Sequence, residues 1–138
     1  NECKEEKIMY NDNVISIFKE FKNVGTIQGA NGVGKVSDPV CGDVVKLYLK
    51  INEDGIIQDA KFKAYGCVGT LACMSVATDL LKRKTITEAL DIKNEHIDKQ
   101  LGGLPTEKSY CSDLAEKSIH AGIEDYYKRI EKLQKEEN

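Results

Sequence analysis

The sequence has no long apolar run. No stretch approaches the roughly 18 to 20 apolar residues that a membrane-spanning helix needs. The charged start "NECKEEK" also lacks the apolar core of a signal peptide. We therefore expect a cytoplasmic protein that has no membrane partner.

An excess of basic charge is also missing. The 20 Lys and Arg residues are interspersed with 23 Asp and Glu residues, which gives a net charge of -3. Interspersed charges of this kind are typical of solvated faces. The composition therefore argues against nucleic-acid binding.

The sequence contains no closely paired cysteines. Its five cysteines are scattered along the chain and their number is odd: Cys3, Cys41, Cys67, Cys73 and Cys111. In a chain for which we expect no export, this pattern argues against a disulfide framework. It favours thiol or metal chemistry instead.

What the sequence does contain predicts one α+β domain over residues 1–138. Apolar and polar residues alternate in 44–51, "VVKLYLKI", and again in 56–65, "IIQDAKFKAY". In the second segment the expected inner face is Ile56, Ala60, Phe62 and Ala64. The turn "NEDG" joins the two strands, and "VGKVSD" is expected to add a third antiparallel strand.

Helical patterns surround these strands. Residues 9–23 carry the apolar stripe of an amphipathic helix, and 68–84 read as a mostly buried helix. Thr85 and Glu88 form a capping box that opens a short helix. A further short helix at 94–101 and a long C-terminal helix complete the expected set. This order predicts helices on one face of an antiparallel sheet, with flexible tails at 1–9 and 131–138.

A nucleotide-binding loop is a weak alternative for "GANGVGKV". The spacing from Gly29 to Lys35 fits the phosphate-loop pattern, but Val36 replaces the magnesium-binding Ser or Thr. Pro39 also follows too closely for a helix to continue. We therefore expect these glycines to shape a turn.

Three cysteines fall at connections between the expected elements. Cys41 lies between two strands, Cys67 at a strand-to-helix junction and Cys111 near the start of the last helix. Such connections can converge at one end of the fold. Helix N-termini lower the pKa of nearby thiols, and Cys67 and Cys111 are both placed for this effect. Asp43 accompanies Cys41 in its turn, where we expect both side chains near solvent. The alternative is that the cysteines are unrelated small core residues.

Three cysteine motifs, "CGD", "FKAYGCVGTLA" and "EKSYCSDLAE", together resemble the IscU/NifU-type iron-sulfur cluster scaffold proteins. "KNVG" and "TITEALDIKNEHI" extend the resemblance over most of residues 10 to 128. It implies a three-stranded antiparallel sheet with packed helices. It also implies that Cys41, Cys67 and Cys111 hold a labile 2Fe-2S cluster, with Asp43 as a candidate ligand. Three thiolates and one oxygen also suit zinc.

The sequence departs from this family at two points. Tyr110 stands where many relatives have histidine, and a phenol with a reference pKa near 10 is a poorer ligand than Asp43. "LPTEK" stands where bacterial relatives have the Leu-Pro-Pro-Val-Lys that a heat-shock chaperone reads. Thr106 and Glu107 therefore argue against that chaperone as a partner.

The remaining candidates have plainer interpretations. Cys73 lies on an apolar helix, which favours buried packing over a reserve ligand, and Cys3 is expected to stay flexible in a charged segment. His96 and His120 are expected to be surface or satisfied helical histidines. Lys108 is either a cation that stabilises the thiolates or the cluster, or a solvated lysine.

The resemblance implies a non-enzymatic scaffold. Such a protein receives sulfur from a cysteine desulfurase and electrons from a donor such as a ferredoxin. It then passes the cluster to recipient apoproteins, as a monomer or a homodimer. The alternative is a zinc-containing sulfur acceptor of the SufU type, whose insertion between the second and third cysteines is missing here. A structural zinc module comes third, because its ligands are normally close-paired.

Overall fold

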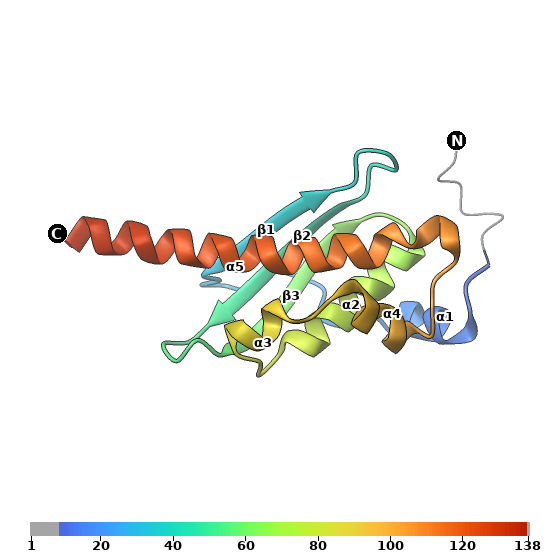
Figure 1. Ribbon diagram of the computed structural model, residues 1–138, viewed down its shortest axis with the longest axis horizontal. Coiled ribbons are helices and arrows are strands. Elements are labelled where there is room, and N and C mark those ends of the chain that lie inside the picture. Colours follow the sequence, from blue (N-terminus) through green and yellow to red (C-terminus); the bar gives the residue numbers. More distant parts are fainter. Residues whose placement is uncertain (1–8, 138) are drawn as a thin grey trace.

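The structure, a computed structural model, describes residues 9–137. Its sheet contains three antiparallel strands in the order β1-β2-β3 (Figure 1). The elements are α1 (Asp12–Lys19), β1 (Gly32–Ser37), β2 (Val44–Ile51), β3 (Ile57–Tyr65), α2 (Val68–Leu81), α3 (Ile86–Leu90), α4 (Asn94–Leu101), a 3-10 helix (Thr106–Lys108) and α5 (Tyr110–Glu137). The predicted α+β fold class is confirmed.

The helices cover one face of the sheet. Helix α5 packs along β1 and β2, and α2 packs on β3 (Figure 1). Alternate strand residues point into this interface, and Leu47, Leu49 and Phe62 are fully buried there. The period-two pattern read from the sequence therefore identifies the inner face of β2.

The inner face of β3 differs from the prediction at its start. Ile57, and not Ile56, is fully buried. Lys50 pairs with Asp59 whereas Ile51 pairs with Ile57, so the register shifts by one residue between these pairs. Such a β-bulge moves the side-chain alternation by one position, which explains why the assignment of Ile56 to the core was wrong.

The glycines of "GANGVGKV" do more than shape a turn. Gly29, with φ 78°, lies in a turn, but Gly32 and Gly34 lie within β1. A Cβ atom on Gly34 would lie 2.4 Å from the backbone nitrogen of Gly122 in α5. The prediction of a turn is therefore wrong for Gly32 and Gly34, whereas the strand predicted from "VGKVSD", which includes Gly34, is confirmed. The missing side chains of both glycines let α5 approach the sheet.

The helix ends largely follow the sequence signals. Thr85 and Glu88 form the predicted capping box of α3, and Gly102 ends α4 with φ 76°. Residues 131–137 are the last turns of α5, and their flexibility stays a prediction. Residues 1–8, which include Cys3, lie outside the described residues. None of the described helices is long and apolar enough to cross a membrane.

Candidate metal centre

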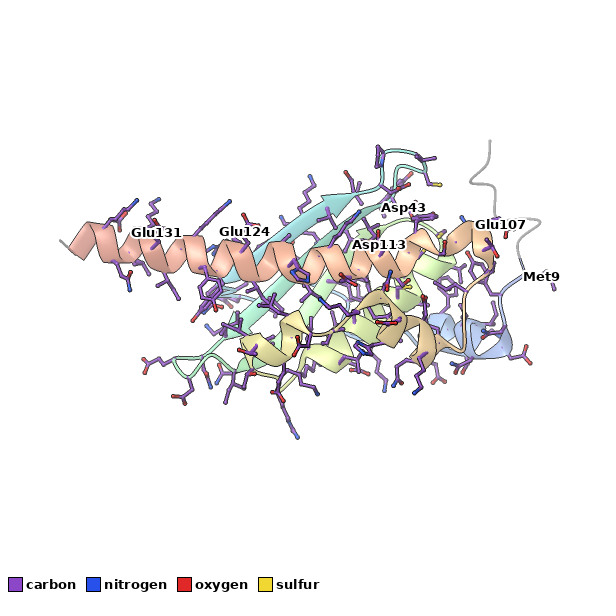
Figure 2. All side chains as sticks on the ribbon, in the orientation of Figure 1. Met9, Asp43, Glu107, Asp113, Glu124 and Glu131 are labelled. Atoms are coloured by element: carbon purple, nitrogen blue, oxygen red, sulfur yellow. The ribbon has the colours of Figure 1, made fainter. Side chains whose placement is uncertain are left out.

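Three chain connections meet at one end of the sheet. Asp43 immediately precedes β2, Cys67 lies between β3 and α2, and Cys111 is in the first turn of α5. One ligand atom from each side chain lies within 4.8 Å of the other two. Figure 2 shows Asp43 close to the start of α5, at the end of the molecule where Glu107 lies. The predicted convergence of the connections is confirmed for these three residues.

The fourth predicted site residue, Cys41, lies at the edge of this group. Its backbone N–H donates to Asp38 Oδ2 at 2.7 Å, which shapes the β1–β2 loop. Cys41 lines the same hollow as Asp43 and Cys67. Cys67, Cys73 and Cys111 are free thiols.

The Asp43 carboxylate is buried, so the expectation that it lies near solvent was wrong. Only 5% of the residue is exposed. Its Oδ2 accepts hydrogen bonds from the Thr70 hydroxyl at 2.5 Å and from the Tyr110 hydroxyl at 3.3 Å. Burial raises the pKa of the Asp43 carboxyl, and the bond from Thr70 opposes this shift.

Thr70 is a site residue that sequence reasoning missed. It is 1% exposed, and its Oγ1 lies 3.4 Å from the sulfur of Cys111 and 3.5 Å from that of Cys67. A signal was available, because Cys67 is the N-cap of α2 and Thr70 is the third residue of that helix. Side chains at this position turn back toward the N-cap.

The two free thiols of the group interact directly. Their sulfur atoms lie 3.6 Å apart. Hydrogen bonding from Cys111 holds the pKa of Cys67 well below its usual range, with help from the Thr70 hydroxyl and backbone N–H. The pKa of Cys111 is raised because it donates to Cys67 and is buried. The expected lowering of the pKa is therefore found for Cys67 and not for Cys111, because ionisation of both thiols would place two negative charges side by side.

Tyr110 and Lys108 complete the surroundings of the site. Burial and the hydrogen bond to Cys67, 3.7 Å from the phenol oxygen, raise the pKa of Tyr110. The phenol therefore stays protonated and acts as a donor. Lys108 is 1% exposed and its Nζ lies 5.7 Å from the centre of the Tyr110 ring. It lines the hollow beside Asp43 and Cys67, so the solvated alternative for Lys108 was wrong.

The other candidates lie away from the group. Cys73 is fully buried in the core, and its burial raises the pKa of its thiol, in agreement with a packing role. His96 and His120 are exposed helical residues, as expected. His96 accepts the backbone N–H of Lys93 at 2.9 Å.

The arrangement of donors fits a metal ion. Two sulfurs bonded to one zinc at about 2.3 Å in tetrahedral geometry lie about 3.8 Å apart. The separation of 3.6 Å between the sulfurs of Cys67 and Cys111 is close to this value. Asp43 adds a carboxylate oxygen from the opposite connection. The three side chains could therefore hold zinc or an iron of an iron-sulfur cluster with little rearrangement.

The chain is similar to proteins that are named iron-sulfur cluster assembly scaffolds. An Archaeoglobus fulgidus protein named iron-sulfur cluster assembly scaffold protein IscU 1 is 43% identical over 127 residues, which cover 92% of this chain and 82% of the relative. The IscU scaffold protein of Azotobacter vinelandii is 46% identical over 120 residues, covering 85% of this chain and 93% of the relative.

Solved structures share the fold. A putative iron-sulfur cluster assembly scaffold protein for the SUF system from Fervidobacterium islandicum has a TM-score of 0.69 at 22% identity, covering 83% of this chain and 96% of its own. A NifU-like N-terminal protein from Brucella abortus has a TM-score of 0.62 at 19% identity, covering 86% and 94%. The NifU-like N-terminal domain family matches residues 9–133, and the chain belongs to this family.

Proposed function

We propose that this protein is a cytoplasmic scaffold on which a 2Fe-2S cluster is assembled and from which the cluster is transferred to recipient apoproteins. One observation carries the proposal: the ligand atoms of Asp43, Cys67 and Cys111 lie within 4.8 Å of one another. The proposal is also supported by the 43% sequence identity to a protein that is named an iron-sulfur cluster assembly scaffold. The protein acts by binding and release, without a catalytic residue of its own.

The proposed ligands of the cluster are Cys41, Cys67, Cys111 and Asp43. Stable iron-sulfur proteins use four cysteines, whereas a carboxylate is a harder and more readily replaced ligand. A site with three sulfurs and one exchangeable oxygen suits a cluster that must be passed on. The buried cation of Lys108 lines the hollow and offsets the negative charge of the thiolates and the cluster.

Sulfur arrives from a cysteine desulfurase as a persulfide. A thiolate of the site attacks the outer sulfur of the enzyme's persulfide, a new S–S bond forms on the scaffold, and the desulfurase cysteine leaves as a thiolate. Electrons from a donor such as a ferredoxin then reduce the transferred sulfur to sulfide, which joins iron in the cluster.

Thr106 and Glu107 are exposed in the 3-10 helix, so their departure from the chaperone motif argues against a heat-shock chaperone as a partner.

A zinc-containing sulfur acceptor is the second candidate. The separation of 3.6 Å between the sulfurs of Cys67 and Cys111 suits one zinc ion as well as one iron. In this case the protein would keep its zinc and only relay sulfur.

One experiment separates the two candidates. The reduced protein is incubated anaerobically with ferrous iron, cysteine, a cysteine desulfurase and reduced ferredoxin, and iron and acid-labile sulfide are then measured. A scaffold should accumulate both in equal amounts and activate an added apoferredoxin. A zinc acceptor should retain zinc, raise desulfurase turnover and accumulate no labile sulfide.

A further inference from the structure

We infer that Thr70 is a positioning residue of the metal centre, whose hydroxyl holds the Asp43 carboxylate in place to receive a metal. This inference rests on the proposed function, because it assigns a role within the same site.

The Thr70 hydroxyl lies in the middle of the ligand group. Its Oγ1 is 2.5 Å from Asp43 Oδ2, 3.4 Å from the sulfur of Cys111 and 3.5 Å from the sulfur of Cys67. A hydroxyl has one proton to donate. The short distance to Asp43 and the greater strength of a bond to a carboxylate direct that proton to Oδ2.

The backbone fixes this hydroxyl relative to the ligands. Thr70 lies in the first turn of α2, one turn after the N-cap Cys67, and it is 1% exposed. A β-branched side chain in a helix has few available rotamers. The hydroxyl therefore has little freedom to leave the position between the connections that carry Asp43 and Cys111.

Asp43 depends on this contact more than on its other side-chain donor. The Tyr110 hydroxyl lies 3.3 Å from the same Oδ2, well beyond the 2.5 Å of Thr70. A buried carboxylate that loses its shortest hydrogen bond is expected to rotate toward other donors. Removing a hydrogen-bond partner that orients a metal-binding side chain typically lowers the metal affinity 10- to 100-fold.

The experiment must distinguish the positioning of Asp43 from two other roles of Thr70. Thr70 could serve only to fill space, or it could act on the two sulfurs and not on Asp43. Thr70→Val keeps the shape and removes the hydroxyl, whereas Thr70→Ser keeps the hydroxyl. Thr78→Val is a matched control, because Thr78 is fully buried in the same helix and donates to the Met74 carbonyl oxygen at 2.7 Å.

The test measures binding of Co²⁺ to the reduced, metal-free protein by its visible absorption. Thr70→Val should bind Co²⁺ about tenfold more weakly than the wild type, while Thr70→Ser and Thr78→Val should bind it normally. In an Asp43→Ala background, Thr70→Val should cause no further loss, because the group that it positions is gone.

Three results would overturn the inference: unchanged affinity in Thr70→Val, an equal loss in the Asp43→Ala background, or no Co²⁺ binding by the wild type. Cobalt binding does not require cluster assembly. If Thr70→Val alone weakens Co²⁺ binding as predicted, but no labile sulfide accumulates in the assembly experiment, the proposed function is refuted and the role of Thr70 is still supported.

Discussion

The sulfur atoms of Cys67 and Cys111 lie 3.6 Å apart although the two cysteines are 44 positions apart in the sequence. They meet because α2 and α5 begin at the same end of the sheet, Cys67 as the N-cap of α2 and Cys111 in the first turn of α5. Hydrogen bonding between the two thiols lowers the pKa of Cys67 and raises the pKa of Cys111, which favours a single negative charge on the pair, at Cys67.

The reactivity of Cys67 should therefore depend little on pH. Its pKa is held well below the usual thiol value, so Cys67 is already a thiolate at neutral pH and remains one as the pH rises. The rate of its alkylation by iodoacetamide should be nearly flat between about pH 6 and 8, whereas an ordinary thiol reacts about tenfold faster per pH unit in this range. Peptide mapping of the metal-free protein would measure this rate. A tenfold rise per pH unit at Cys67 would show that Cys111 does not lower the pKa of Cys67 in this way.

Asp43 and Tyr110 should differ in their effects on cluster transfer. Asp43→Ala removes the proposed exchangeable ligand and should alter cluster lifetime and slow transfer to apoferredoxin. Tyr110→Phe should do little, because the phenol stays protonated and Asp43 keeps its shorter hydrogen bond from Thr70. Transfer kinetics followed by circular dichroism would compare the two variants. Normal transfer by Asp43→Ala together with a lost cluster in Tyr110→Phe would show that the tyrosine is the oxygen ligand.

Gly34→Ala should destabilise the protein. The added Cβ would lie 2.4 Å from the backbone nitrogen of Gly122, so α5 would have to move away from β1. Overpacking of this kind costs about 1–3 kcal/mol, which urea denaturation can measure. Ser37→Ala, at the exposed end of the same strand, is the matched control and should change stability by less than about 0.5 kcal/mol. Equal stability of the two variants would mean that helix and strand are less closely packed than described.

Much of the fold and of the site could be read from local patterns. The alternation in β2, the capping box at Thr85 and the apolar character of α2 are properties of neighbouring residues. The convergence of Cys67 and Cys111 followed from their positions at element boundaries, since such connections gather at the ends of a layered fold.

What the sequence did not reveal depends on contacts between distant segments. Asp43 looks exposed beside Gly42, and only the packing of Thr70 and Tyr110 around it makes it buried. The raised pKa of Cys111 requires the sulfur of Cys67 nearby. The bulge that selects Ile57 over Ile56 follows from strand pairing, because two adjacent isoleucines fit either alternation.

We propose that Cys41, Cys67 and Cys111 belong to one iron-sulfur binding centre and that Cys73 does not. The most direct measurement is anaerobic reconstitution of the reduced protein with iron and sulfide, followed by visible absorption and iron analysis. Cys41→Ser, Cys67→Ser and Cys111→Ser should each remove most of the 2Fe-2S absorption. Cys73→Ala should retain it. An equal loss in Cys73→Ala, with the fold intact by circular dichroism, or full cluster content in Cys67→Ser and Cys111→Ser, would contradict the account.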